Sequence, residues 1–205
     1  MAKLLLVRHG ETDRNSSQRY WGKTDVGLGP AGLRQAEMVR DRLATEKIDH
    51  IYSSKMQRSL VTAQTIASIH RLPVEACPEI NEVDFGDMEG LNFSEIHSRF
   101  PEVSRMWIER SPDLAYPHGE SLAQLETRVA EFRKRLLKHA AGETVLIVAH
   151  AGVLRTLICQ LLVLELCHRW NFRVDLASLS IVETFPEISI LSLFNDTSHL
   201  VDNGR

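Results

Sequence analysis

The sequence has few cysteines, and their spacing is not that of a bonded framework. Cys77, Cys159 and Cys167 are odd in number and form no C-x-x-C pair, which argues against both a set of disulfides and a thiolate metal site. We interpret them as buried apolar residues of a protein kept in a reducing compartment. The expected location is therefore the cytoplasm.

Long apolar runs are also missing. The longest, residues 153–166, is interrupted by Arg155, Thr156 and Gln160, so it predicts a buried helix rather than a membrane span. The apolar run near the start covers only residues 4–7, which is too short for the apolar region of a signal peptide. We expect no membrane partner and no secretion.

The sequence also lacks an excess of basic residues. The 24 Lys and Arg against 27 Asp and Glu give a formal net charge of −3, so no surplus is available to neutralise the phosphates of a nucleic acid. This argues against nucleic acid as a dedicated partner but leaves room for a local positive pocket. The remaining composition, 43% apolar and 25% charged over 205 residues, is that of a globular domain with a sizeable core.

What is present is an alternation of strand and helix patterns. Short continuous apolar runs predict buried strands, and apolar residues that recur every three or four positions predict helices. The clearest helix begins after Ser121, which forms a capping box with Gln124. The predicted strands cover residues 3–7, 49–53, 73–76 and 144–149, with a hairpin of 178–184 and 188–194, and the predicted helices cover 30–46, 57–69, 122–136 and 152–164.

This alternation predicts the α/β class: a three-layer sandwich with a mostly parallel central sheet and helices on both faces. We expect residues 1–205 to form a single domain. A less regular stretch, about residues 91–118, contains Pro101, Pro112 and Pro117. It is expected to form a small helical cap insertion over one end of the sheet.

Ligands of such sheets bind beyond the carboxyl ends of the strands, and two histidines follow strands directly. Arg8 and His9 come after the first strand, Arg58 lies beyond the second, and His150 follows residues 144–149. Positive charge from the arginines disfavours a protonated imidazole, so we expect His9 to be neutral and nucleophilic. Guanidinium forks suit a tetrahedral oxyanion and repel a cation. With no His-x-His or His-Glu-x-x-His spacing in the sequence, we expect neither a metal nor another cofactor.

The strand-end residues belong to a series of motifs that runs in one order from residue 8 to residue 155. The motifs are Arg8-His9-Gly10-Glu11-Thr12 with Asn15, Trp21-Gly22-x-x-Asp25-x-x-Leu28, Gly32-x-x-Gln35-Ala36, Ser54-x-x-x-Arg58-x-x-x-Thr62-Ala63, Glu82-x-x-x-Gly86-x-x-Glu89-Gly90, Gly119-Glu120-Ser121 and Val148-Ala149-His150-Ala151-Gly152. This series resembles the signature of the histidine phosphatase superfamily, in its phosphoglycerate mutase-like branch. The resemblance covers most of the chain.

The resemblance implies a division of roles. His9 would attack phosphorus and become a phosphohistidine, while Glu82 would protonate the leaving alcohol and then deprotonate the attacking water. The phosphoryl group would be held by Arg8, Asn15, Arg58, His150 and Ala151. No metal or other cofactor is implied, and an acid in this role predicts an acidic-to-neutral pH optimum.

Two positions depart from the family pattern. Gly29-Pro30 follows Leu28 where Thr or Ser is usual, and because glycine is an adequate helix N-cap we expect a small effect. Met88 stands where Trp is common before Glu89, which changes the packing expected behind Glu82.

Three functions stay open within the resemblance: a phosphatase, a phosphoglycerate mutase, and a non-catalytic module that binds a phosphorylated ligand. The resembled mutases carry a long substrate segment after the acidic motif, whereas here only residues 91–118 lie there. We therefore favour a metal-independent phosphatase whose partner is a small phosphorylated metabolite. The tail, residues 193–200, is similar to that of α-ribazole phosphatase-like members, which makes α-ribazole 5'-phosphate the candidate substrate.

Two further features of the sequence concern the cap and the last cysteine. The cap residues Arg99, Arg105, Trp107 and Arg110 are expected to select the substrate, with a solvated helix face as the alternative. The spacing of Cys167 and Arg173 is that of cysteine-dependent phosphatases, but the residues between them are bulky and lack glycine, so a phosphate-cradling loop is rejected. The oligomeric state stays open, with a homodimer as one alternative.

Overall fold

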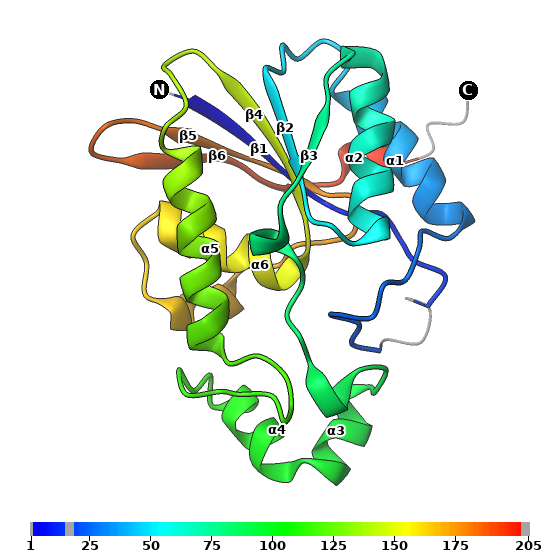
Figure 1. The fold of residues 1–205 in the computed structure, drawn as a ribbon, viewed down its shortest axis with the longest axis vertical. Coiled ribbons are helices and arrows are strands. Elements are labelled where there is room, and N and C mark those ends of the chain that lie inside the picture. Colours follow the sequence, from blue (N-terminus) through cyan, green and yellow to red (C-terminus); the bar gives the residue numbers. More distant parts are fainter. Residues whose placement is uncertain (1, 15–18, 202–205) are drawn as a thin grey trace.

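A computed structural model describes residues 2–14 and 19–201, which form a six-stranded mixed sheet (Figure 1). The strands are β1 (Ala2–Arg8), β2 (His50–Ser53), β3 (Val74–Ala76), β4 (Thr144–Ala149), β5 (Leu179–Thr184) and β6 (Ser189–Asp196), in the spatial order β3-β2-β4-β1-β5-β6. The first four are parallel, and β5 and β6 form an antiparallel hairpin on the β1 side. The predicted α/β class, the mostly parallel sheet and the C-terminal hairpin are confirmed.

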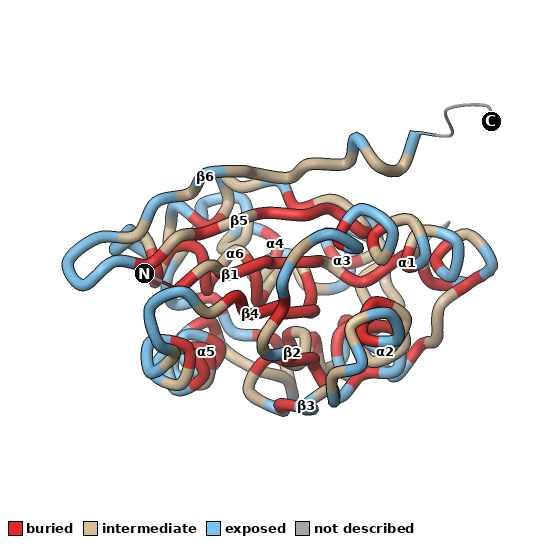
Figure 2. The backbone as a smooth tube through the Cα atoms, turned by 90° about the horizontal axis from the view of Figure 1, so that it is seen from above, coloured by how far each residue is buried: buried red, intermediate tan, exposed pale blue. Residues whose placement is uncertain are grey.

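Alternating residues of β1 separate two cores, one on each face of the sheet. Leu4 and Leu6 pack into the core that contains α5 (Leu122–Leu136) and α6 (Ala151–Leu161). Leu5 and Val7 pack into the core of α1 (Pro30–Arg42) and α2 (Gln57–His70). A strand buried on both faces is apolar throughout, and all six residues of β4 are buried as well (Figure 2). The three-layer arrangement therefore follows from the apolar runs.

The helix starts follow the sequence more closely than the helix ends. At the start of α5, the Ser121 hydroxyl accepts from the Gln124 N–H at 3.2 Å, and the Gln124 side chain accepts from the Ser121 N–H at 2.8 Å. The α1 helix begins after Gly29, as expected, but ends at Arg42 rather than near residue 46. The α6 helix ends at Leu161 because Val163 adopts a left-handed backbone with φ of +56°, which stops the helix.

Residues 91–118 contain two short helices, α3 (Phe93–Arg99) and α4 (Pro101–Ile108). In Figure 1 they lie together at the bottom, beyond the carboxyl ends of the parallel strands. Four 3₁₀ helices complete the described chain: η2 (Pro78–Ile80), η3 (Gly86–Met88), η4 (Leu166–Asn171) and η5 (Ser198–Leu200). No helix among the described residues is long and apolar enough to cross a membrane.

Candidate active site

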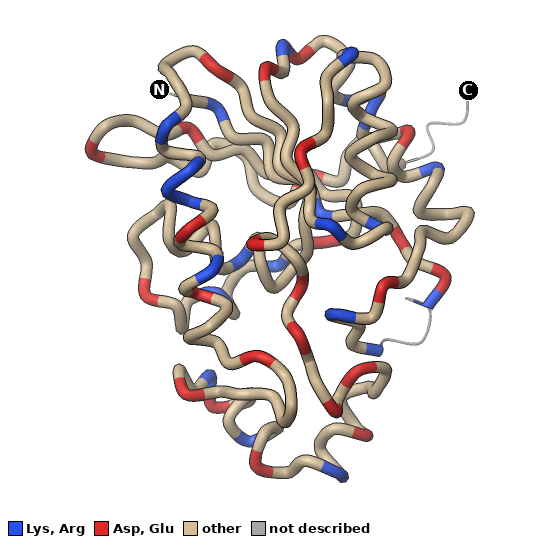
Figure 3. Tube along the Cα trace, viewed as in Figure 1, with Lys and Arg blue, Asp and Glu red and all other residues tan. Residues whose placement is uncertain are grey.

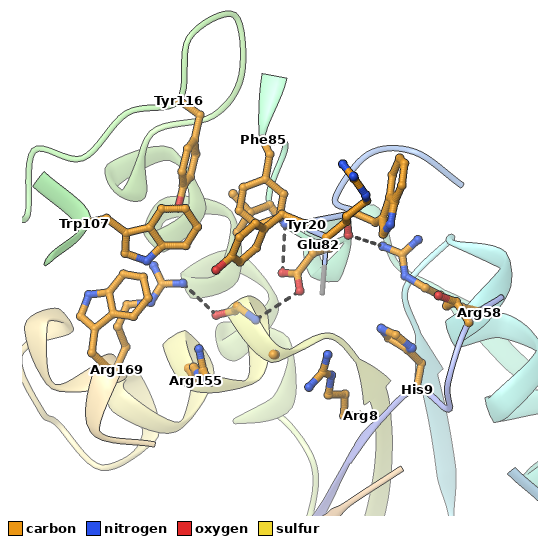
Figure 4. Close-up of a pocket in the computed structure, with 17 residues that line it drawn as sticks. Arg8, His9, Tyr20, Arg58, Glu82, Phe85, Trp107, Tyr116, Arg155 and Arg169 are labelled. Atoms are coloured by element: carbon orange, nitrogen blue, oxygen red, sulfur yellow. Dashed lines mark hydrogen bonds between the residues drawn. The ribbon is translucent and has the colours of Figure 1, made fainter. Parts of the chain in front are cut away.

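A cavity of about 350 Å³ opens at the carboxyl ends of the parallel strands, between the sheet and the cap helices (Figure 4). Five of the residues predicted from the sequence line it, namely Arg8, His9, Arg58, Glu82 and Ala151. His150 lies behind this wall, with its ring centroid 4.9 Å from that of His9. Asn15 falls outside the described residues. The parallel strands thus bring together side chains that are up to 143 positions apart in the chain, from Arg8 to Ala151.

His9 follows β1 and is held in one orientation. Its Nδ1 lies 2.7 Å from the Gly10 carbonyl oxygen, and because a carbonyl can only accept, Nδ1 carries the proton. The lone pair therefore belongs to Nε2. Burial, followed by the charges of Arg8 and Arg58, lowers the pKa of His9 well below 6.5. A neutral imidazole with a free Nε2 is the form that can act as a nucleophile.

Arg58, at the start of α2, is 1% exposed and is held mainly by backbone carbonyls. Its Nη1 donates to Thr24 at 3.0 Å, and its Nη2 donates to Gly22 at 2.8 Å and to Trp21 at 3.3 Å. A buried guanidinium is stable only when its donors find acceptors. The segment of residues 21–24 supplies them and fixes the guanidinium at the edge of the cavity.

His150 is fully buried, and both of its ring nitrogens have partners. The Arg58 Nε–H donates to Nδ1 at 3.3 Å, so the proton lies on Nε2, which donates to the Ser54 hydroxyl at 2.7 Å. Burial, then the charges of His9 and Arg58, lowers the pKa of His150 well below 6.5. In this structure the ring supports Arg58 and packs against His9. Its predicted contact with a phosphoryl oxygen would require an exchange of the Ser54 bond and stays a prediction.

Arg8, the last residue of β1, has donors left for a ligand. Its Nη1 donates to the Val174 carbonyl at 2.7 Å, while its buried Nε has no partner among the described residues. Burial lowers the pKa of Arg8 to about 10, against the raising effect of the Glu82 charge. The side chain is therefore cationic at neutral pH and lies in the cavity wall.

Glu82 reaches the cavity from the segment after β3. Its Oε1 accepts from the Val83 N–H at 3.0 Å and its Oε2 accepts from the Gly152 N–H at 3.3 Å. A Cβ on residue 152 would lie 2.5 Å from Oε1, so glycine at the start of α6 is what admits the carboxylate. These backbone donors place the Glu82 carboxylate at the rim of the arginine cluster.

The acidic residues next to Glu82 have structural partners of their own. Asp84 pairs with Lys23 at 3.3 Å and Asp87 with His118 at 2.8 Å. The Glu89 carboxylate accepts from the backbone N–H groups of residues 22–24. Glu89 therefore shapes the segment whose carbonyls hold Arg58, and the fully buried Met88 packs in the core rather than in the cavity.

The cap contributes less charge to the cavity than the sequence suggested. Of the four cap residues singled out, only Trp107 lines the cavity. Arg105 pairs with Glu102 and Glu109 on the exposed face of α4, and Arg110 bonds to Asn171. For the cap arginines, the solvated-face alternative describes what the structure shows.

Sequence reasoning missed several residues of the cavity wall. Arg155 lies on α6, five positions beyond His150, and Arg169 and Trp170 lie on η4. Cys167 and Arg173 of the rejected cysteine motif do not line the cavity, whereas Arg169 and Trp170 between them do. The available signal was the position of Arg155 one helical turn after Ala151, which puts both on the same helix face.

Charge is concentrated inside the cavity rather than over the molecule. Along the chain the two signs are interspersed (Figure 3), but the cavity is lined by five arginines and one carboxylate, Arg8, Arg19, Arg58, Arg155, Arg169 and Glu82. Such a site favours a small anion with several oxygens. The two clusters of potential metal ligands found in the described part of the chain, around His139 and around Cys167, do not line it.

Comparison with known proteins agrees with this arrangement. The family model of the histidine phosphatase superfamily (branch 1) matches residues 4–197. The chain is 35% identical over 200 residues to phosphoserine phosphatase 1 of Hydrogenobacter thermophilus, covering 98% of this chain and 95% of that protein. It is 30% identical over 202 residues to the adenosylcobalamin/alpha-ribazole phosphatase of Escherichia coli, covering 98% and 100%. The crystal structure of the alpha-ribazole phosphatase from Shigella flexneri superimposes with a TM-score of 0.87 at 30% identity, covering 95% and 96%.

Proposed function

The chain belongs to the histidine phosphatase superfamily and is a hydrolase of phosphomonoesters, and from this premise we propose that it works through a phosphohistidine at His9 without a metal ion. The observation that carries the proposal is the state of His9. Its Nδ1–H is held by the Gly10 carbonyl, and its ring is buried beside two arginines. That arrangement leaves Nε2 unprotonated next to a site for a tetrahedral anion.

In the first step, His9 Nε2 forms a bond to phosphorus while the bond from phosphorus to the ester oxygen breaks. Arg8 and Arg58 stabilise the negative charge on the transferred oxygens. Protonated Glu82 gives its proton to the leaving alcohol, so the alcohol departs neutral and Glu82 becomes a carboxylate.

In the second step, a water molecule attacks the phosphohistidine. The Glu82 carboxylate takes a proton from this water as the new bond from oxygen to phosphorus forms and the bond from nitrogen to phosphorus breaks. Inorganic phosphate leaves, neutral His9 is regenerated, and Glu82 is again protonated. Each group ends in its starting state, as turnover requires.

Phosphoglycerate mutase activity is the alternative reaction of the same site. A mutase would return the phosphoryl group to the bound product instead of giving it to water. The short segment between Gly90 and Gly119 and the opening of the cavity at the strand ends favour access of water, which supports the phosphatase.

The substrate class is a small phosphorylated metabolite, and α-ribazole 5'-phosphate stays the candidate suggested by the sequence. The rings of Tyr20, Trp107 and Trp170 line the cavity and would suit a ligand with an aromatic base. Relatives named for α-ribazole and for phosphoserine both cover nearly the whole chain. We also propose a cytoplasmic location, supported by three cysteines that are all free.

The test is hydrolysis of an aryl phosphate in EDTA, with the His9→Ala variant as control. We expect turnover by the native protein and almost none by the variant. No turnover by the native protein would favour the non-catalytic phospholigand module. Products from 3-phosphoglycerate then separate the two reactions, since a phosphatase yields glycerate and phosphate and a mutase yields the 2-isomer.

A further inference from the structure

Three arginines in the cavity take no part in the mechanism above, and one of them, Arg19, is paired with Glu95 at 2.8 Å. Arg155 on α6 and Arg169 on η4 both line the cavity, on the side away from His9 (Figure 4). They are carried by elements that follow the last parallel strand, and among the described residues neither forms a hydrogen bond with Arg8, Arg58 or His150. Their presence adds two cationic groups beyond those that one phosphate needs.

Arg169 is the more deeply buried of the two, at 3% exposed. Among the described residues its guanidinium makes one hydrogen bond, from Nη2 to the Gly152 carbonyl at 3.4 Å. Its Nε and Nη1 are buried and have no partner there. Buried donors without acceptors are costly and rare in native proteins, so donors in a cavity wall point to an acceptor that a ligand supplies.

Arg155 also has a buried donor without an acceptor among the described residues. Its buried Nε has no hydrogen-bond partner, and no ion pair with a described carboxylate involves either Arg155 or Arg169. An arginine keeps its proton in proteins, so both side chains are cations, and the charge of Glu82 acts on both without forming an ion pair. By contrast, the exposed Arg105 of the cap pairs with two glutamates.

Aromatic rings lie next to Arg169 in the cavity wall. The Arg169 guanidinium lies 5.1 Å from the centroid of the Trp170 ring, which orients it by a cation–π contact. Trp170 packs on Trp107 at 5.9 Å, and Trp107 packs on Tyr20 at 4.9 Å. A guanidinium held against a ring and shielded from water binds an anion more strongly than one in solvent.

We propose that Arg155 and Arg169 form a second anion subsite, which binds a carboxylate or a second phosphate of the substrate while Arg8 and Arg58 hold the phosphoryl group that is transferred. The inference rests on the proposed function and narrows it: the substrate is a small phosphomonoester with a second anionic group. A guanidinium fork fits a carboxylate or a phosphate equally. α-Ribazole 5'-phosphate offers aromatic surface but no second anion, so it is a poorer substrate on this account.

The experiment compares substrates that differ only in the second anion. 3-Phosphoglycerate carries a carboxylate where glycerol 3-phosphate carries a hydroxymethyl group, and fructose 1,6-bisphosphate adds a phosphate to fructose 6-phosphate. We expect kcat/KM to be about 10–100-fold higher for the anionic member of at least one pair, mainly through KM. The pair that shows the preference identifies the anion as carboxylate or phosphate.

Variants assign the preference to the two arginines. In Arg169→Met and in Arg155→Met we expect the ratio of kcat/KM within the responding pair to fall toward one. The matched control is Arg105→Met, which removes an exposed cap arginine and should leave the ratio as it is in the native protein. If Arg169→Met does not fold, Arg155→Met, which is less buried, carries the test.

Two outcomes would overturn the subsite, and they differ from failure of the proposed function. If both members of each pair react within about threefold, or if the arginine variants lower the rates of both members equally, the subsite does not exist although the phosphatase does. If no substrate is turned over, calorimetry of substrate binding to the His9→Ala variant still decides whether the subsite exists. Tighter binding of 3-phosphoglycerate than of glycerol 3-phosphate, lost in the double variant with Arg169→Met, would support the subsite, and equal binding would refute it.

Discussion

The strand-end side of the cavity and the side formed by α6, η4 and the cap hold their charged groups in opposite ways. At the strand ends, Arg58 donates to three backbone carbonyls and to His150, and the His9 ring is fixed by the Gly10 carbonyl. On the other side, Arg169 packs on the Trp170 ring, and both Arg155 and Arg169 keep buried nitrogens without partners among the described residues. Apart from the Arg8 Nε, which has no partner among the described residues, the first side is organised before any ligand binds, whereas the second is completed by one.

This difference separates chemistry from selection. Preorganised donors stabilise the charge that develops in the transition state, so the strand-end side should control kcat. Groups that find their acceptors only on a particular ligand should control KM and the ratio between substrates. Variants on the strand-end side, on the cap side and outside the cavity can therefore separate these effects.

Removal of the nucleophile should have the largest effect. In His9→Ala we expect aryl phosphate turnover in EDTA to fall by at least about 10³-fold, since no other group can form the covalent intermediate. Steady-state kinetics measure this, and circular dichroism of the variant checks its fold. Retention of activity within tenfold of the native protein would break the assignment of the strand-end side to chemistry.

Glu82→Gln should distinguish leaving groups. The loss of proton transfer should lower kcat for an alkyl phosphate by roughly 10²–10⁴-fold. An aryl phosphate, whose leaving group needs little protonation, should lose much less. The comparison of the two substrates is the measurement, and an equal loss for both would show that Glu82 does not act as the acid.

Acid should destabilise the protein through its buried histidines. The pKa values of His9 and His150 are lowered well below 6.5 by burial and by the nearby arginines. The unfolded chain therefore takes up protons below about pH 6.5 that the folded protein does not, and the free energy of unfolding falls as pH falls. Each histidine accounts for at most about 2 kcal/mol of this loss by pH 5, because its pKa in the unfolded chain is about 6.5.

Urea unfolding at pH 7.5 and pH 5 measures that loss. In His9→Ala the decrease between the two pH values should be smaller, by at most about 2 kcal/mol, since only His150 still contributes its share. An unchanged decrease would mean that burial and the arginines do not lower the pKa of His9 in the folded protein.

On the cap side, a change should alter binding more than chemistry. Trp107→Leu removes ring contacts with Tyr20 and Trp170, and we expect KM to rise by about 2–10-fold with a smaller change in kcat. The matched control is Ile108→Ala on the same helix, whose side chain is 63% exposed. A loss confined to kcat would contradict the separation of the two sides.

A position outside the cavity provides the smallest effect. Ser121→Ala removes the capping box of α5 and should lower the free energy of unfolding by about 1 kcal/mol. Urea unfolding measures it, and substrate ratios should stay as in the native protein. A change in these ratios would show that the cavity depends on the packing of α5 and not only on its own walls.

The sequence predicted the two sides of the cavity unequally, for a physical reason. Arg8, His9 and Arg58 follow buried apolar strands, and parallel strands must end at one edge of a sheet, so their meeting could be inferred from local patterns. Glu82 and Ala151 needed the family resemblance as well. The position of His150 behind the wall could not be inferred, because it depends on the bonds from Ser54 and Arg58.

The other side depends on packing that no local pattern encodes. Arg169 reaches the cavity because η4 folds back against the start of α6 and because Trp170 supports the guanidinium. The lack of small residues in this segment argues against a backbone loop that cradles phosphate. It does not argue against an anion site formed by side chains, which the sequence pattern does not reveal. The helix ends at Arg42 and Leu161 were also missed, because the apolar pattern continues past the point where the backbone turns away, as at Val163 with its φ of +56°.

The central claim is that His9 becomes phosphorylated during turnover. Rapid quenching of the native protein with substrate, followed by digestion at neutral pH and mass spectrometry, measures it most directly. We expect one phosphoryl group on the peptide that contains His9. It should form at least as fast as turnover and disappear when the substrate is exhausted. Turnover with no phosphorylated His9, or with the phosphoryl group on another residue, would contradict it.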